Sequence, residues 1–142
     1  MTIVGLLDSL RISGSGLTAE RVRMDTIANN LANANTTRTE QGGPYRRQMV
    51  LFSAVESDRR QKFRVGGGVR VLGIVEDPTA PRLVYDPQHP DADSEGYVQM
   101  PNVNVITEMV DLISATRAYE ANITAINAAK AMAMKALDIG RG

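Results

Sequence analysis

The last third of the chain, residues 103–139, most constrains what this protein can fold into. It contains no proline and no glycine, and it is rich in alanine, methionine and leucine, which favour helices. Largely apolar residues recur every three and four positions, a spacing typical of a helix that supercoils against a partner. The spacing has two interleaved lines: Val105, Leu112, Tyr119, Ile126 and Ala133, and Met109, Thr116, Ile123, Lys130 and Leu137.

A helix over these residues would be roughly 50 Å long at 1.5 Å per residue. A chain of 142 residues is the size of one ordinary domain. Its own core does not need a helix of that length. We therefore expect part of this helix face to contact another chain.

A second periodic segment occupies residues 3–34. The sequence Ser13-Gly14-Ser15-Gly16 interrupts it, and glycine costs about 1 kcal/mol inside a helix. We therefore predict a short helix or flexible arm over 3–12 and a firm helix from Leu17 to Ala34, with Thr18 as candidate N-cap. One line of this segment is strongly apolar (Ile3, Leu10, Leu17, Met24, Leu31), whereas its companion is mixed (Leu6, Ser13, Glu20, Ile27, Ala34).

The end of this second helix is rich in asparagine, with Asn29, Asn30, Asn33 and Asn35 close together. Asparagine favours caps and turns, so one interpretation is C-terminal capping and fraying, which applies best to Asn35. The other is that Asn29, Asn30 and Asn33 make side-chain hydrogen bonds that fix the register between packed helices. The sequence leaves both interpretations open.

The middle of the chain predicts a small β-rich module. Residues 45–52, 69–76 and 82–85 are rich in β-branched and aromatic residues, and Gly- and Pro-containing turns separate them. Gly66-Gly67-Gly68 favours a turn into a strand, because no Gly-Lys-Ser/Thr follows as in a phosphate-binding loop.

Residues 56–64 hold a charged stretch with Asp58, Arg59, Arg60, Lys62 and Arg64. An anion-binding patch is one interpretation. A solvated loop is the better one, because sixteen basic and sixteen acidic residues cancel over the chain. The same balance argues against nucleic-acid binding, which normally requires a basic excess.

The sequence excludes other classes of protein. There is no cysteine, so disulfides and thiolate metal sites are absent. No run of 18 apolar residues could span a membrane. Residues 1–10 lack Lys and Arg, so we expect no cleavable secretory signal and, if the protein leaves the cytoplasm, another route.

The loop over residues 86–101 is the most distinctive. Asp91, Asp93 and Glu95 resemble the start of a calcium loop, but the twelfth position, which should be a bidentate Glu, is Asn102. His89 is the single histidine and has no second His or Cys with which to share a metal. We expect no metal, no cofactor and no small-molecule substrate.

Several motifs carry a family resemblance. Residues 27–36, Ile-Ala-Asn-Asn-Leu-Ala-Asn-Ala-Asn-Thr, resemble the signature of flagellar rod, hook and hook-associated axial proteins. Four further motifs make the chain similar to the proximal rod proteins of the flagellar basal body: Tyr-Arg-Arg-Gln at 45–48, Leu-Val-Tyr-Asp-Pro-Gln-His-Pro-Asp-Ala-Asp at 83–93, Gly-Tyr-Val-Gln-Met-Pro-Asn-Val-Asn at 96–104, and Arg-Ala-Tyr-Glu-Ala-Asn at 117–122.

The resemblance implies a structural role in cell motility. Members of this family stack as a helical tube through the periplasm, and their terminal helices line a channel that passes export substrates. They are exported by the flagellar type III machinery. The implied partners are copies of itself, other rod proteins, and the rod-base and export-gate components.

The predicted fold class is α+β, with long N- and C-terminal helices pairing as a coiled-coil-like arm around a small β-rich module. The predicted parts are an N-terminal helical arm (1–36), a β-rich module with the proline-rich loop (37–101) and a long C-terminal helix (102–142). The predicted assembly interface comprises Leu17, Met24, Asn30, Leu31, Asn33, Val105, Met109, Leu112, Tyr119, Ile123, Ile126 and Leu137.

An enzyme and a coiled-coil adaptor are the two alternatives to this assignment. An enzyme would have to use Asp86, His89, Asp91 and Asp93 as an acid–base cluster, and a proline-rich loop beside a thin core offers little of the water-excluding pocket that catalysis needs. A soluble coiled-coil adaptor fits the periodicity equally well, and only the motifs count against it.

Overall fold

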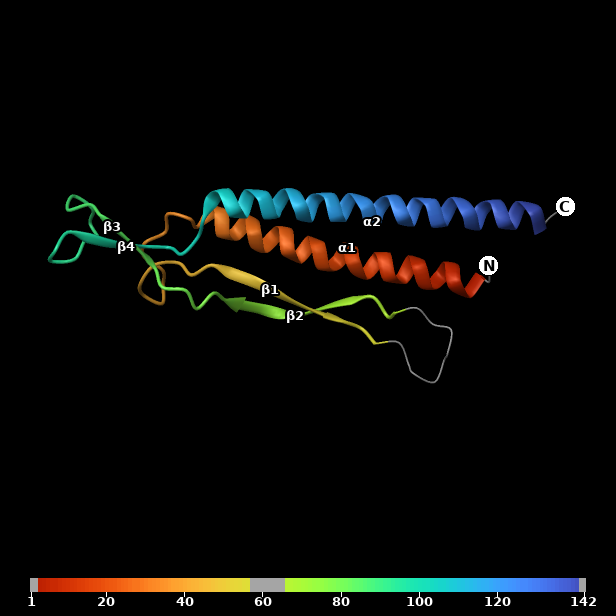
Figure 1. Ribbon diagram of the computed structural model, residues 1–142, viewed down its shortest axis with the longest axis horizontal. Helices are drawn as coiled ribbons and strands as arrows, with labels where there is room; N and C mark the ends of the chain where they lie inside the picture. Colours follow the sequence, from red (N-terminus) through yellow and green to blue (C-terminus); the bar gives the residue numbers. More distant parts are fainter. Residues whose placement is uncertain (1–2, 57–65, 141–142) are drawn as a thin grey trace. The chain divides into compact units, whose positions relative to one another are not determined.

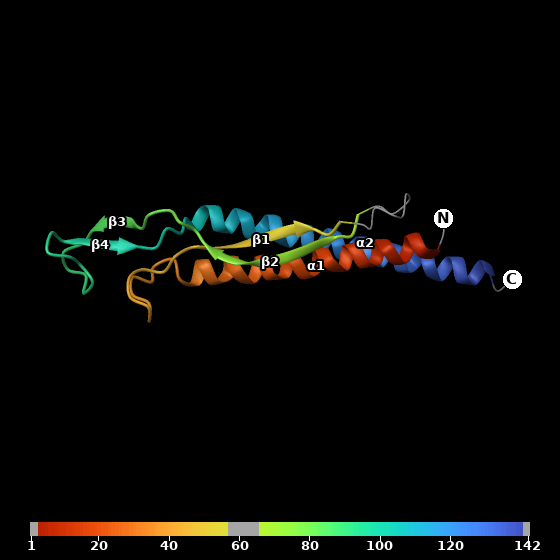
Figure 2. The same ribbon diagram turned by 90° about the horizontal axis from the view of Figure 1, so that it is seen from below.

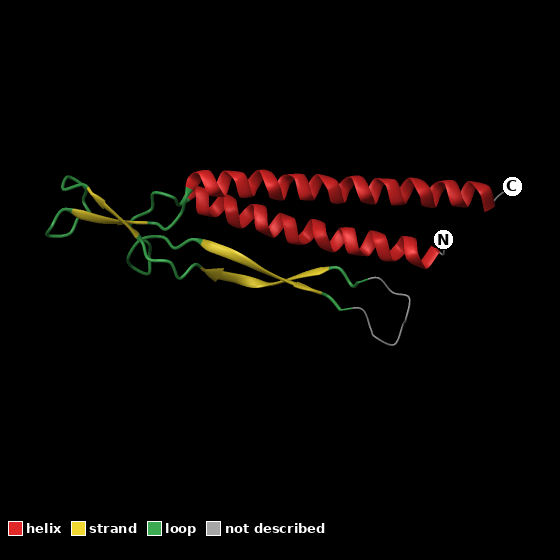
Figure 3. Ribbon diagram, in the orientation of Figure 1, coloured by secondary structure: helices red, strands yellow, loops and turns green. Residues whose placement is uncertain are grey.

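The computed structural model describes residues 3–56 and 66–140. Within them, two long helices flank four short strands (Figure 1, Figure 3). The order is α1 (Ile3–Ala32), β1 (Gln48–Ala54), β2 (Val69–Glu76), β3 (Arg82–Tyr85), β4 (Tyr97–Met100) and α2 (Val105–Gly140). The predicted α+β class, with long terminal helices and a small strand module between them, is confirmed.

The chain divides into two compact units, and most elements contribute to both. The first unit comprises Met1–Val22, Leu51–Gly73 and Ser114–Gly142, and the second comprises Arg23–Val50 and Ile74–Ile113. Within each unit a segment of α1 lies beside a segment of α2 (Figure 1). None of the helices in residues 3–56 and 66–140 has both the length and the apolar character needed to cross a membrane.

Helix α2 begins where Asn104 caps it. The Asn104 Oδ1 atom accepts hydrogen bonds from the backbone N–H groups of Ile106 (3.1 Å) and Thr107 (3.2 Å). These N–H groups have no partner within the helix, so the cap satisfies them. From there the helix continues without Gly or Pro to Gly140, which confirms the long C-terminal helix.

Helix α1 is continuous through Ser13-Gly14-Ser15-Gly16, so the predicted break before Leu17 is wrong. Thr18 is not an N-cap, because its hydroxyl donates to the carbonyl of Gly14 at 3.2 Å inside the helix. Two of its small residues, Ser15 and Gly16, make close tertiary contacts, whereas Gly14 has no neighbour within 4 Å of an added Cβ. A Cβ atom at Gly16 would lie 2.9 Å from Asn122 Nδ2 of α2, so a glycine lets the helices approach closely there.

Ser15 connects α1 to the start of β2. Its hydroxyl donates to the Ile12 carbonyl at 2.7 Å and accepts from the Val69 backbone N–H at 3.0 Å. Gly68, with φ of +96°, places its backbone directly against Ser15. Tertiary contacts of this kind offset the intrinsic helix cost of Ser and Gly.

Strands β1 and β2 form a two-stranded sheet, and both views show them side by side (Figure 1, Figure 2). Backbone bonds join Asp77 N–H to Arg47 C=O at 2.7 Å and Val55 N–H to Gly68 C=O at 2.9 Å, which makes the pairing antiparallel. The strand predicted over 45–52 lies at 48–54, and β2 and β3 lie where predicted. The charged stretch between β1 and β2 lies, apart from Glu56, outside the described residues.

Strands β3 and β4 form a second antiparallel pair, with Arg82 opposite Met100 and Tyr85 opposite Tyr97. Strand β4 lies within residues 86–101, for which the sequence predicts a loop, so that prediction is wrong at 97–100. The strand has four residues, between Gly96 and Pro101, and such short segments give little periodicity.

The two lines of residues predicted on α2 differ in their exposure. Leu112, Tyr119 and Ile126 are half-buried, but Met109, Thr116, Ile123, Lys130 and Leu137 are all exposed. The line that completes the inward face comes one position earlier: Glu108, Ala115, Asn122 and Ala129. On α1 the buried positions are Ala19, Thr26, Ile27 and Asn30. Small and polar residues, rather than large apolar ones, therefore occupy much of the helix contact.

Replacing Gly68 with Ala tests the contact between the hairpin and α1. We expect Gly68→Ala to lower the free energy of unfolding by more than the roughly 1–2 kcal/mol that a left-handed conformation costs a residue with a Cβ. The excess arises because the new methyl group would overlap Ser15 Oγ. Urea unfolding followed by circular dichroism measures it.

Gly42→Ala is the matched control. Gly42 has φ of +84° but no atom within 4 Å of the added Cβ, so only the conformational strain applies. Equal losses in the two variants would show that the Ser15 contact does not constrain the fold.

Candidate assembly site

The predicted interface residues fall into three groups by exposure within the single chain. Asn30 is buried, with 1% of its surface exposed. Seven are half-buried: Leu17, Met24, Leu31, Asn33, Leu112, Tyr119 and Ile126. Four are exposed on α2: Val105, Met109, Ile123 and Leu137.

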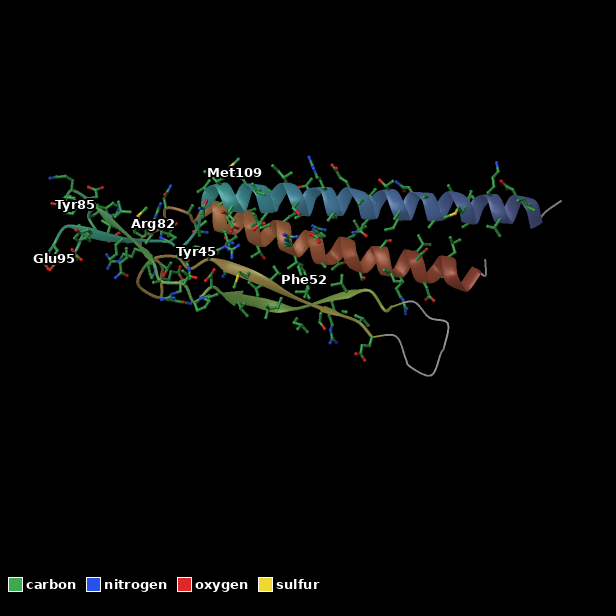
Figure 4. All side chains as sticks on the ribbon, viewed as in Figure 1. Tyr45, Phe52, Arg82, Tyr85, Glu95 and Met109 are labelled. Carbon is green, nitrogen blue, oxygen red and sulfur yellow. The ribbon has the colours of Figure 1, made fainter. Side chains whose placement is uncertain are left out.

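Helix α2 carries many exposed large apolar residues near both of its ends. In the second unit its exposed residues include Ile106, Met109, Val110 and Ile113, and Figure 4 shows Met109 projecting from the side of α2 away from α1. In the first unit they include Met132, Met134, Leu137 and Ile139. Contiguous exposed apolar surface is typical of protein contact sites.

A buried carboxylate lies between the helices in the second unit. Glu108 of α2 has 0% of its surface exposed. Its Oε1 accepts from Arg47 Nε at 2.5 Å, and its Oε2 accepts from Asn30 Nδ2 at 3.0 Å. An ionised carboxylate is very costly to bury without such partners, so these donors are required for the packing.

The Asn30 side chain uses its full hydrogen-bonding capacity. Its Nδ2 donates to Glu108 Oε2 (3.0 Å) and to the Gln48 carbonyl (2.8 Å). Its Oδ1 accepts from the Gln48 N–H (2.9 Å) and the Tyr45 hydroxyl (2.9 Å). An amide can make two donations and two acceptances of this kind. Asn30 therefore fixes the register of α1 against α2 and β1 within the chain.

Arg47, just before β1, joins three carboxylates. Besides Glu108, its guanidinium lies 3.5 Å from Asp77 Oδ2 and 3.7 Å from Asp111 Oδ2. Burial opposes its charge, but the hydrogen bonds and charges of Glu108 and Asp77 outweigh burial, so the pKa of Arg47 is raised. Asp111 also lies 3.9 Å from Arg23 of α1, which adds a second charged link between the helices.

Asn102 makes hydrogen bonds to the backbone of Arg47 and of the residues that follow β2. Its Oδ1 accepts from the Arg47 N–H at 2.7 Å, and its Nδ2 donates to the carbonyls of Asp77 (3.3 Å) and Thr79 (3.0 Å). The side chain and backbone N–H of Thr79 donate to Asp77, and together with Arg47 they lower the pKa of that carboxyl. The segment before α2 is thus bonded to the residue before β1 and to the residues that follow β2.

Tyr45 completes the cluster. Burial, followed by the nearby charges of Glu108 and Glu76, raises the pKa of its hydroxyl. The proton that this shift retains is the one donated to Asn30. We call Asn30, Tyr45, Arg47, Asn102 and Glu108 the polar cluster.

The other asparagines behave differently from Asn30. Asn33 Nδ2 donates to the Asn29 carbonyl (2.9 Å) and to Asn29 Oδ1 (3.1 Å), and its Oδ1 accepts from Thr36 Oγ1 (3.2 Å). These bonds are local and close the end of α1. Asn29 is exposed and donates to Tyr45 and Gln48. The predicted bond between helices is therefore found at Asn30, whereas for Asn33 that prediction is wrong, because its side-chain bonds are to Asn29 and Thr36.

The acidic side chains of the loop between β3 and β4 mostly bond the loop itself. Asp93 Oδ1 accepts from the N–H groups of Glu95 and Tyr97, both at 2.9 Å. Asp91 accepts from Thr37 at 2.8 Å, and His89 Nδ1 accepts from the Asp91 N–H at 3.0 Å. Such bonds shape a turn. Within residues 3–56 and 66–140, no three His, Cys, Asp or Glu side chains come together as a metal site would require.

The sequence predicts a bonding role for Asn30, but it does not point to Glu108, Arg47 or Asn102 as members of the polar cluster. Glu108 lies between apolar positions in the first turn of a helix, where an exposed Glu is ordinary. The available signal was the position of Glu108 seven residues before Ala115, which in turn lies seven before Asn122.

Comparison with known proteins identifies relatives over nearly the whole chain. The family model "Flagella basal body rod protein" matches residues 10–38, and "Flagellar basal body rod FlgEFG protein C-terminal" matches residues 94–139. The chain is 52% identical to the flagellar basal-body rod protein FlgC of Bacillus subtilis, with 94% of this chain and 97% of the relative covered. It is 47% identical to FlgC of Borreliella burgdorferi (98% and 100% covered) and 42% identical to FlgC of Salmonella typhimurium (97% and 100% covered).

Single alanine substitutions separate the roles of the asparagines. Asn30→Ala should lower the free energy of unfolding by at least about 1–3 kcal/mol, the cost of one buried group left unsatisfied. Asn33→Ala should be close to neutral, because it loses local bonds but gains up to about 0.7 kcal/mol of helix propensity. Urea unfolding of the purified chain measures both, and equal effects would contradict the assignment.

The ion pair of the polar cluster can be tested with a double-mutant cycle. Glu108→Leu alone should cost about 3–5 kcal/mol, because it leaves the Arg47 guanidinium without its closest partner. Adding Arg47→Met should recover part of that loss, with a coupling of about 0.5–3 kcal/mol. Strictly additive losses in the cycle would mean that the two side chains do not depend on one another.

Proposed function

We infer the function from the premise that the chain belongs to the FlgC family of flagellar basal-body rod proteins. We propose that it is a structural subunit of the proximal rod, located in the periplasm, and that it polymerises helically through its terminal helices. In a helical polymer each interface joins two different surfaces and does not close on itself.

The observation that carries this proposal is the distribution of apolar residues on α2. The buried residues of α2 are polar or small, whereas Met109, Ile123 and Leu137 are exposed together with several neighbours. An isolated chain gains nothing from exposing them to water. Packing of this outward face against neighbouring subunits would bury it, at roughly 25 cal/mol per Å² of apolar surface.

The polar cluster supports a mechanical role. Satisfied hydrogen-bond networks in a low dielectric are rigid, because any displacement leaves a buried polar group unpaired. Asn30, Arg47 and Glu108 join α1, β1 and α2 in this way. We propose that torque passes from the helices to the strand module through these bonds, and between subunits through side-to-side packing.

The partners follow from the family. We propose that the chain contacts copies of itself, other flagellar rod proteins, and components at the rod base and export gate. Its terminal helices would face the channel through which export substrates pass. We propose no catalytic step, since the carboxylate of Asp93 accepts a hydrogen bond within its own loop and that of Asp91 accepts one from Thr37.

A charged substitution on the outward face of α2 tests the proposal. Ile123→Asp should leave the purified chain folded, because Ile123 is already exposed in it. It should abolish swimming in a strain whose only copy is the variant, because burying an unpaired carboxylate in a packed interface costs several kcal/mol. The measurements are circular dichroism of the purified chain and a motility assay.

Ile123→Leu is the matched control, because it keeps the apolar character and nearly the same volume. It should swim normally. Normal swimming with Ile123→Asp would remove this face of α2 from the assembly interface.

A further inference from the structure

The β3–β4 hairpin presents an exposed apolar face. Side chains alternate across strands, and the register pairs Leu83 with Gln99 and Tyr85 with Tyr97. These four side chains therefore share one face. Leu83 is 62% exposed, Tyr85 65% and Tyr97 41%.

The two tyrosines on this face are held in a fixed arrangement. Their ring centroids are 5.3 Å apart with an interplanar angle of 66°, an edge-to-face contact. Gly96 has φ of +85°, and a Cβ there would lie 2.9 Å from Tyr85 Cε2, so the ring packs closely on the turn. Rigid, exposed tyrosines lose little entropy on binding and are common anchors of protein interfaces.

The loop beside these rings is acidic. Residues 82–97 contain Asp86, Asp91, Asp93 and Glu95 but only one basic residue, Arg82, apart from His89. Asp86, Asp93 and Glu95 are exposed. Figure 4 shows Tyr85 and Glu95 at the same end of the hairpin. A matching surface should therefore be apolar with a positive charge.

Such a surface lies on the last part of α2. Ile123, Lys130, Met134 and Leu137 are spaced by seven, four and three residues, so they lie on one face of the helix, and all four are exposed. We call them the α2 strip. A methionine sulfur contacts aromatic rings favourably, and a lysine ammonium is attracted both to tyrosine faces and to carboxylates.

We propose that the exposed face of the β3–β4 hairpin of one copy binds the α2 strip of a second copy. Leu83, Tyr85 and Tyr97 cover the apolar side chains of the strip, and the acidic loop faces Lys130. The two surfaces differ, so the contact is heterologous and repeats from copy to copy. The inference rests on the proposed function and adds a specific pair of surfaces to it.

Cross-linking in assembled rods tests this contact, because the native chain has no cysteine. Two differently tagged copies are co-expressed in a strain lacking its own copy, one with Leu83→Cys and the other with Leu137→Cys. Isolated basal bodies are treated with a short bismaleimide. We expect a product that carries both tags, which only a contact between two copies can give.

Leu72→Cys paired with Leu137→Cys is the control, because Leu72 is 58% exposed on β2 and is not part of the hairpin face. The Leu83–Leu137 product should be several times more abundant than the control product. An equal or smaller yield overturns the proposal.

Charge reversal gives an independent readout in the same preparation. Glu95→Lys or Lys130→Glu alone should reduce the Leu83–Leu137 product severalfold, and the two together should restore it. A combined variant no better than either single variant also overturns the contact.

Motility distinguishes a failure of the hairpin contact from a failure of the proposed function. Strains that swim with both cysteine variants but yield no specific product contradict the hairpin contact and leave the proposed function intact. A strain that builds no rod even with the unmodified chain contradicts the proposed function itself.

Discussion

A carboxylate without exposure to water requires a complete set of donors, and the second unit is organised around that requirement. Glu108 on α2 obtains its donors from α1 through Asn30 and from the residue before β1, Arg47. Each of these partners is in turn fixed by others: Asn30 by the Gln48 backbone, and the backbone of Arg47 by Asn102. A buried charge with satisfied partners specifies one arrangement of helices and strands, because alternatives leave it unpaired.

The elements that the sequence predicted well are those with strong local signals. Helix α2 has no Pro and no Gly before Gly140, and β2 and β3 are largely apolar segments bounded by turn residues. The error at Gly14 and Gly16 came from treating helix propensity as decisive. At Gly16 a tertiary contact with Asn122 outweighs propensity, and nothing local reveals that a residue more than one hundred positions away lies against Gly16.

The candidate site was only partly predictable. Asn30 could be singled out because asparagine is unfavourable inside a helix and needs a reason to be there. Glu108 and Arg47 could not, because charged residues are almost always exposed and these two are 61 positions apart in sequence. Exposure could not be predicted on α2 either: the line that begins at Met109 is exposed, and the line that begins at Glu108 faces inward. Apolar periodicity identifies residues that avoid water, but it does not say whether they are covered by their own chain or by a neighbour.

The small inward residues of the helices have a thermodynamic consequence. Gly16, Ala115 and Ala129 contribute little apolar surface to the contact inside the chain, whereas bulky residues such as Met109 and Leu137 contribute theirs outside it. If the chain assembles as proposed, burial of these exposed residues adds to its stability, and its apparent stability then depends on subunit concentration. In the proposed polymer, resistance to heat and denaturant would exceed that of the free subunit.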